Sequence, residues 1–259
     1  MRHSHFLCGL LACALGASAC TGSTEDDQAG SNIQLGTEDA QHLNVVLLQV
    51  LRIGGGSRFC SGTMIGARTL LTSAHCVADI TWGAAYLTSP GVSSVGALFE
   101  DWVIPDEYIP GDDFHLAQAD LAVVSLQGDL NLGPDSLLWV APILGERLTF
   151  LGYGMTQPKD PHRGISSFFI GNLRRDMILL YGIIGGEGDS GGPGLVDGGD
   201  GSEVIAGVLS GGGPDPEDDN HPPISYFTRV DLYLDWIATY SRGGFVGLNT
   251  ARFASQPSD

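Results

Sequence analysis

Positively charged side chains are scarce in this sequence. Of its 259 residues, only 12 are Lys or Arg against 30 Asp or Glu, and the formal net charge is −18 at pH 7. Binding to a phosphate backbone needs concentrated Lys and Arg, so this composition argues against a nucleic-acid partner. An acidic surface of this kind more often serves solubility than the recognition of a cationic partner.

No apolar run reaches the roughly 20 residues that a membrane-spanning helix needs. The run from Phe6 to Ala19 is shorter, and it follows Arg2 and closes with Ala17-Ser18-Ala19. A short positive start, an apolar middle and an A-x-A end are typical of a secretory signal peptide. We therefore expect residues 1–19 to be a signal peptide and the mature chain to be secreted or held in the cell envelope.

Cys20 follows the expected cleavage point and opens the polar, acidic stretch 20–32, which predicts a flexible tether. A cysteine as the first mature residue resembles a bacterial lipoprotein signal, in which that cysteine receives lipid. Ala17 stands where such signals usually have Leu. Two outcomes stay open: a membrane tether through lipidated Cys20, or release after ordinary signal cleavage.

Cysteines are also few in the body of the chain. Cys8 and Cys13 lie in the expected signal, so only Cys60 and Cys76 remain beyond Cys20. An exported pair suggests one disulfide. Two cysteines without a second pair make a poor zinc site, and the acidic stretch 214–221 lacks the spacing and glycine of a calcium loop. We expect neither a metal nor a cofactor.

Long helical patterns are missing except near the end of the chain. Thirty-eight glycines and thirteen prolines separate short apolar runs such as Leu43–Leu51, Leu121–Leu126 and Val204–Leu209. This spacing predicts an all-β sandwich or barrel rather than alternating βαβ units. One helix is expected at Asp231–Tyr240, with Asp231 capping its N-terminus.

Three short segments carry the residue types of nucleophilic catalysis. They are TSAHC at 72–76, ADLAVV at 119–124 and GDSGGP at 188–193. The first offers an imidazole, the second a carboxylate at the head of an apolar strand, and the third a hydroxyl in a glycine-rich turn. Together they supply a base, a group that orients the base, and a nucleophile.

The expected roles follow from the chemistry of serine, which alone is a poor nucleophile near neutral pH. His75 would remove the proton of Ser190 and later give it to the leaving amine, while Asp120 would hold the imidazole in the required tautomer. The glycines around Ser190 allow a tight turn with backbone N–H groups that bind a developing oxyanion.

In this order and with these flanks, the three segments resemble the signature segments of the chymotrypsin/trypsin family of serine proteases. The resemblance runs from about Ile33 to Tyr240, so residues 33–240 are the expected protease domain and 241–259 a C-terminal tail. It implies an all-β fold of two six-stranded antiparallel β-barrels with a C-terminal helix, and an active site between the barrels. It also implies an endopeptidase for polypeptide substrates that forms an acyl-enzyme on Ser190, and we expect a monomer.

The resemblance assigns further roles near the nucleophile. It implies that the backbone N–H groups of Gly188 and Ser190 bind the oxyanion. It also implies that Cys60 and Cys76 form the family's disulfide beside the catalytic histidine.

Substrate recognition is implied in the same way. The edge strand that pairs with the substrate backbone would contain Ser210, Gly211 and Gly212. Ile184 matches the position at the base of the specificity pocket, and Ser225 would line the same pocket. Because Ile184 cannot bind Lys or Arg as a carboxylate does, we expect a preference for apolar or small side chains before the cut bond.

Activation in this family follows a cleavage that frees an N-terminus, whose ammonium pairs with the aspartate before the serine. Asp189 supplies that carboxylate, and Ile33 would be the new terminus. Asn32 precedes Ile33, whereas activation sites typically have Arg or Lys there. Either a protease of another specificity makes the cut, or Asp189 has a different partner.

Two other classes of protein compete with the protease. The segment around Ser190 also fits the G-x-S-x-G elbow of α/β-hydrolases, but that fold needs a helix directly after the serine, and Gly-Gly-Pro-Gly follows here. The non-enzymatic alternative is a catalytically silent, protease-like binding module. Such modules typically replace a triad residue, and none is replaced here; only the atypical Asn32 junction favours this class.

Overall fold

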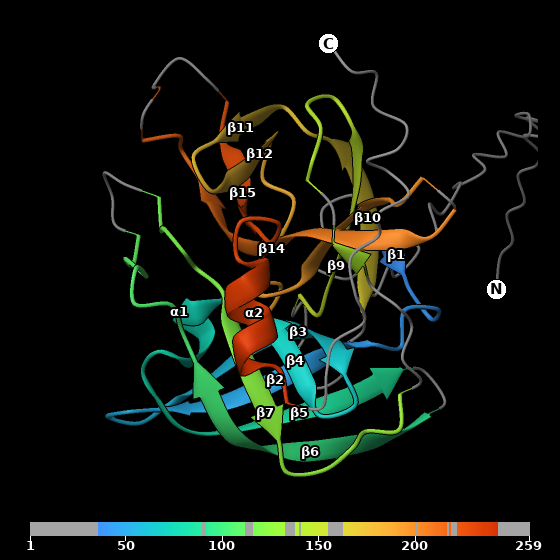
Figure 1. The fold of residues 1–259 in the computed structure, drawn as a ribbon, viewed down its shortest axis with the longest axis vertical. Coiled ribbons are helices and arrows are strands. Elements are labelled where there is room, and N and C mark those ends of the chain that lie inside the picture. Colours follow the sequence, from blue (N-terminus) through green and yellow to red (C-terminus); the bar gives the residue numbers. More distant parts are fainter. Residues whose placement is uncertain are drawn as a thin grey trace, which may run out of the picture.

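A computed structural model describes residues 36–89, 92–111, 116–132, 138–139, 141–154, 163–199, 201–216, 218 and 222–242. The expected signal peptide 1–19, the tether 20–32 with Cys20, the expected terminus Ile33 and residues 243–259 of the tail lie outside these ranges. Figure 1 shows two β-rich halves, one above the other, with a short helix in front of their junction.

The first half is a closed barrel of six antiparallel strands. Its order is β2-β3-β4-β7-β6-β5, and α1 (Ala74–Val77) follows β4. The strands are β2 (Val45–Arg52), β3 (Ser57–Gly66), β4 (Thr69–Thr72), β5 (Ile80–Ser89), β6 (Val92–Val103) and β7 (Ala122–Leu126). Leu48, Leu70 and Val124 are fully buried inside it. The expected six-stranded barrel is therefore confirmed for this half.

The second half is a nine-stranded sheet. Its order is β1-β10-β9-β13-β14-β15-β12-β11, and β8 pairs in parallel with β14. The strands are β1 (Thr37–Glu38), β8 (Leu138–Trp139), β9 (Arg147–Gly152), β10 (Gly164–Phe169), β11 (Asn172–Arg174), β12 (Met177–Tyr181), β13 (Pro193–Asp197), β14 (Glu203–Gly213) and β15 (Ile224–Arg229). The all-β class is confirmed, but within the described ranges this half has more strands than the expected six, because β1 and β11 extend the two ends of the sheet and β8 pairs with β14.

The C-terminal helix is shorter than expected. It is α2 (Leu234–Tyr240), and Tyr233 holds the N-cap position without a side-chain capping bond. Asp231 does not cap the helix, because it lies two residues before the N-cap, and its carboxylate pairs with Arg229, with an Oδ2-to-guanidinium distance of 2.6 Å. Ile237 is buried against residues of both halves, so α2 helps to join them.

A shared apolar cluster holds the two halves together. It contains Leu47 and Val123 from the barrel and Leu151 and Val208 from the sheet. Burial of such side chains contributes about 1.5–3 kcal/mol each. This cluster packs the two halves against each other.

An ion pair between two side chains fixes the segment that precedes β2 to the sheet. Arg163 is buried, and its Nε donates to Asp39 Oδ2 at 2.6 Å. The same guanidinium donates to the backbone oxygen of Val45 at 3.2 Å and to the hydroxyl of Tyr153 at 3.0 Å. One arginine thus connects the N-terminal segment, the barrel and the sheet.

Within the described ranges, no helix combines the length and hydrophobicity needed to cross a membrane.

Candidate active site

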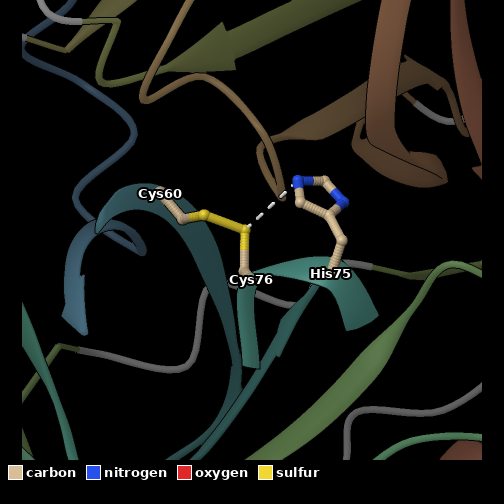
Figure 2. A group of neighbouring side chains, drawn as sticks. All are labelled: Cys60, His75 and Cys76. Carbon is tan, nitrogen blue, oxygen red and sulfur yellow. Dashed lines mark hydrogen bonds between the residues drawn. A yellow bond between two sulfur atoms is a disulfide. The ribbon is translucent and has the colours of Figure 1, made fainter. Parts of the chain in front are cut away.

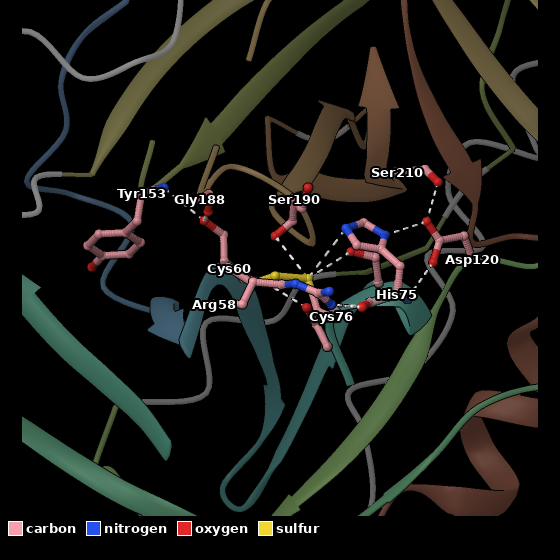
Figure 3. The surroundings of a disulfide bond; sticks show 12 residues. Arg58, Cys60, His75, Cys76, Asp120, Tyr153, Gly188, Ser190 and Ser210 are labelled. Carbon is pink, nitrogen blue, oxygen red and sulfur yellow. Dashed lines mark hydrogen bonds and ion pairs between the residues drawn. A yellow bond between two sulfur atoms is a disulfide. The ribbon is translucent and has the colours of Figure 1, made fainter. Parts of the chain in front are cut away.

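His75 and Asp120 meet because strands β4 and β7 are paired. Thr72 at the end of β4 lies opposite Ala122 at the start of β7. The residues just after β4 and just before β7 therefore emerge at the same end of the barrel. There, Asp120 Oδ2 lies 2.8 Å from His75 Nδ1, and Oδ1 accepts the backbone N–H of His75 at 2.9 Å (Figure 3).

The Asp120 carboxylate is completely buried and has a third donor. The hydroxyl of Ser210 donates to Oδ2 (Figure 3). Ser210 occupies a register shift of β14 between Leu209 and Gly211, and a bulge of this kind can aim a side chain out of the regular alternation. Burial raises the pKa of Asp120, but the charge of His75 and the hydrogen bonds from His75 and Ser210 outweigh it and hold the pKa below its usual range.

Ser190 lies on a turn that only glycines permit. Gly188 and Gly191 have φ angles of +96° and +85°. A Cβ atom on Gly191 would lie 2.2 Å from the backbone oxygen of Ser61. The backbone N–H of Ser61 also donates to the carbonyl of Ser190 at 2.7 Å. The turn that carries Ser190 therefore packs directly against the barrel.

The structure brings the three predicted triad residues to one place. Cys76 Sγ lies 3.7 Å from His75 Nε2 and 3.8 Å from the carbonyl oxygen of Ser190 (Figures 2 and 3). Among the described contacts, no hydrogen bond joins the Ser190 hydroxyl to His75. In unliganded enzymes the catalytic hydrogen bond is often long and forms fully only with substrate.

Two backbone donors flank the nucleophile. Neither the N–H of Gly188 nor that of Ser190 has an acceptor among the described residues. Both belong to the turn that the Ser61 side chain also anchors, since its hydroxyl donates to the carbonyl of Gly188 at 2.9 Å. A pair of such N–H groups can stabilise an oxygen that becomes negatively charged.

Cys60 and Cys76 form a disulfide that ties β3 to α1 next to His75 (Figure 2). The two sulfurs and a His75 nitrogen lie within 4.8 Å of one another. Zinc binds cysteine as the thiolate, and sulfurs joined in a disulfide cannot supply it. The cluster is therefore a brace for the histidine and not a metal centre.

A pocket of about 230 Å³ opens beside Ser190. Its wall is formed by Ile183, Gly185, Gly186, Glu187, Ser190, Leu209, Gly211, Gly212 and Ser225. Three of the residues that the sequence assigns to substrate binding, Gly211, Gly212 and Ser225, are in this lining, whereas the Ser210 hydroxyl donates to Asp120.

The pocket also corrects one prediction. Ile184 does not line it; the side chain is 1% exposed and packs in the sheet core, while its N–H donates to the Ser225 hydroxyl at 3.0 Å. The neighbouring Ile183 faces the pocket instead. Glu187 is exposed and also lines this pocket.

Asp189 is a second buried carboxylate, and no cation contacts it within the described chain. Its Oδ2 accepts the N–H of Gly186 at 2.9 Å, and Oδ1 has no hydrogen-bond partner. Burial raises the pKa of Asp189 to about 7, although the N–H groups of Gly186 and Gly154 oppose this effect. A Cβ atom on Gly152 would lie 2.3 Å from Oδ1, so glycine is needed there.

Comparison with known proteins gives a consistent picture. The sequence matches the family described as Trypsin over residues 34–237. It is 28% identical to a chymotrypsin of Phaedon cochleariae over 221 residues, which cover 74% of this chain and 75% of the relative. It is also 28% identical to brachyurin of Leptuca pugilator, covering 70% of this chain and 87% of that protein.

Solved structures share the fold. A structure of GrC superposes with a TM-score of 0.62 at 19% identity, covering 79% of this chain and 97% of that one. The structure of HL collagenase gives a TM-score of 0.60 at 22% identity, covering 79% and 96%. At these identities the similarity concerns the arrangement of the chain and not its substrates.

Proposed function

Because the chain belongs to the trypsin family of serine proteases, we propose that His75, Asp120 and Ser190 are its catalytic triad. Membership makes the chain a serine-type endopeptidase, the class of its homologues. The observation that supports this triad best is the double contact of the buried Asp120 with the ring and the backbone of His75, at 2.8 Å and 2.9 Å.

The geometry suggests the following course of reaction. The oxygen of Ser190 attacks the carbonyl carbon of the peptide bond, and His75 Nε2 takes the hydroxyl proton. The carbonyl oxygen becomes an oxyanion, which the N–H groups of Gly188 and Ser190 stabilise. When the C–N bond breaks, His75 gives the proton to the leaving amine and an acyl ester remains on Ser190.

Hydrolysis of the ester uses the same groups. A water molecule attacks the acyl carbon while His75 removes one of its protons. The ester bond then breaks, and the proton returns to the oxygen of Ser190. Asp120 remains ionised in both halves of the reaction and stabilises the imidazolium, which is its role in the general triad.

Labelling with a serine-reactive fluorophosphonate tests this assignment. The mature wild-type chain should be labelled and should cleave peptides, while Ser190→Ala should do neither. A chain that folds but is not labelled would support the silent binding module. Labelling retained by Ser190→Ala, with esterase activity, would support a hydrolase of another class.

We further propose that the pocket beside Ser190 selects small or apolar side chains before the cut bond. Its inner wall combines Ile183, Ser225 and glycines, and its one ionisable side chain, Glu187, is exposed. A peptide library should show this preference, and a clear preference for Arg would contradict it. Ile183→Asp should shift cleavage towards Lys and Arg, whereas Ile183→Val is the matched control.

We also propose that a protease cuts the chain before Ile33 during maturation. The new N-terminal ammonium would then pair with the unpartnered oxygen of Asp189. The protease domain would then be residues 33–240 of a monomer that acts on polypeptides, and a lipid on Cys20 would hold only the uncut precursor in the cell envelope. Mass spectrometry of the active chain tests this: an N-terminus at Ile33 supports it, and an intact N-terminus before Asn32 contradicts it. A separate mass spectrum of the uncut precursor decides whether Cys20 carries lipid.

A further inference from the structure

The backbone just before Asp120 has an unusual conformation. Ala119 has a φ angle of +48° and is buried. This left-handed region is unfavourable for alanine because its Cβ crowds the carbonyl, whereas glycine adopts it freely. Such strain persists only where surrounding contacts impose it, and it is frequent at functional sites.

The contact that imposes it comes from the other half of the molecule. The backbone N–H of Ala119 donates to Asp176 Oδ2 at 2.8 Å. Asp176 lies in the turn between β11 and β12, and the preceding residue, Arg175, is also left-handed, with φ +54°. Two of the three non-glycine residues with positive φ in the described chain therefore adjoin this one hydrogen bond.

Asp176 is itself held in place. Its Oδ2 also accepts the hydroxyl of Tyr233 at 3.1 Å, just before α2. Its carbonyl oxygen accepts the backbone N–H of Arg229 at 2.7 Å. The carboxylate is thus a fixed acceptor on the sheet, presented to the segment that leads into β7.

The effect reaches Asp120 through the backbone. The carbonyl of Ala119 accepts the N–H of Leu121 at 2.9 Å, so Asp120 is the central residue of a three-residue turn. The direction of its side chain depends on the conformation of that turn. If Ala119 relaxed to negative φ, the turn and the carboxylate would rotate together, away from His75.

We propose that Asp176 is a positioning residue, whose hydrogen bond to Ala119 fixes the direction from which Asp120 contacts His75. This role rests on the proposed triad. The acceptor on the sheet compensates for an alanine at a position that glycine would fill without strain. It also explains why a carboxylate from one half contacts a backbone N–H of the other half.

Asp176→Ala tests the proposal in the mature chain. Removing the acceptor should lower kcat by about 10- to 100-fold, the scale expected when a catalytic group is displaced by about 1 Å. KM should change little, because neither Asp176 nor Ala119 lines the substrate pocket. The acid side of the kcat/KM profile should also move, because the imidazole has lost part of its contact with Asp120. A merely structural role would lower the melting temperature without moving this profile.

Two further variants make the test specific. In the Asp176→Ala background, Ala119→Gly should restore at least a third of the lost factor in kcat, because glycine adopts the left-handed conformation without help. Asp176→Asn keeps an acceptor oxygen and should retain most of the activity. Tyr233→Phe removes the other donor to the same oxygen, leaves the Ala119 contact intact, and should keep kcat within about twofold.

The proposal fails if folded Asp176→Ala keeps kcat within twofold, or if Ala119→Gly does not raise the kcat of that variant. If Asp176→Ala does not fold, Asp176→Ser, which remains polar but is too short to reach Ala119, takes its place with the same expected results. Failure of the triad itself is seen separately, as activity retained in Ser190→Ala.

Discussion

Asp120 and Asp189 are both completely buried near the proposed nucleophile, yet they lie in opposite electrostatic environments. Asp120 contacts an imidazole and a hydroxyl, and its pKa is lowered. Asp189 accepts only peptide N–H groups, one of its oxygens has no partner, and its pKa is raised to about 7.

Burial acts in the same direction on both carboxyl groups, because it disfavours the charged form. The difference therefore comes from the partners. The interactions with His75 and Ser210 outweigh the loss of hydration for Asp120, whereas two peptide N–H groups do not do so for Asp189. Peptide N–H groups alone do not hold the pKa of a buried carboxyl group in its usual range at this junction.

Removing the charge of Asp120 should have the largest effect. Asp120→Asn keeps the size of the side chain but cannot stabilise the imidazolium or hold the required tautomer of His75. We expect kcat on a peptide substrate to fall by about 10⁴-fold at pH 7, the scale typical of this substitution in a triad. A loss below tenfold in folded Asp120→Asn would contradict the assigned role.

The charge of Asp189 should change the free energy of unfolding, and this effect is smaller than the loss of kcat expected for Asp120→Asn. An acid whose folded pKa of about 7 lies above its unfolded value of about 3.9 gives stability that is complete below pH 4 and is lost as pH rises towards 7. For the uncut chain this amounts to about 4 kcal/mol. In the processed chain a paired ammonium at Ile33 would lower the pKa and remove the loss.

Urea unfolding of cut and uncut chains between pH 4 and pH 8 measures this difference directly. Both chains should carry Ser190→Ala to prevent self-digestion. The two chains differ in titrating groups only by the new ammonium and by the residues removed before Ile33, so an Asp189→Asn pair of chains is needed to isolate the part of the difference that reports Asp189. If the two chains lose stability in parallel, the ammonium does not pair with Asp189; in the Asp189→Asn background they should be parallel.

Both aspartates could be identified from the sequence alone. Asp120 and Asp189 each lie in a short motif that can be recognised in the sequence, although the partners of Asp120, His75 and Ser210, lie 45 and 90 residues away. Apolar runs and glycines then determine the local backbone, as for Gly188 and Gly191, whose positive φ angles only glycine adopts easily. Such residues are predictable because the signal is contiguous.

What sequence missed depends on contacts between distant residues or on irregular backbone. Asp176 and Arg163 reach partners 57 and 124 residues away, and no local pattern marks either of them. Ile183 and Ile184 lie between strands, where the alternation of a β-strand no longer tells which side chain faces the pocket. Asp231 has the residue type of a helix cap, but its carboxylate accepts hydrogen bonds from Arg229.

A third buried carboxylate, Asp39, extends the comparison and gives the smallest expected effect. It pairs with Arg163 and also lies 2.9 Å from Nδ1 of His42, whose Nε2 lies 2.7 Å from Glu203. These two acidic partners raise the pKa of His42 to about 9, although its burial opposes them. His42 is therefore a cation at neutral pH and joins the N-terminal segment to β14.

Because the folded pKa of His42 lies above its unfolded value of about 6.5, its contribution should be complete below pH 6.5 and lost as pH rises through 9. We expect about 1–2 kcal/mol of unfolding free energy, less than the full shift implies, because Glu203 is 44% exposed and its pairing is weakened by water.

The measurement is urea unfolding from pH 6 to pH 10 for wild type and His42→Gln, with Glu203→Gln as the matched control that removes only the exposed partner. The difference between wild type and His42→Gln should vanish near pH 10, while Glu203→Gln should show a smaller difference over the same range. If His42→Gln instead runs parallel to wild type from pH 6 to pH 10, the imidazole is not charged, and Asp39 depends on Arg163 alone.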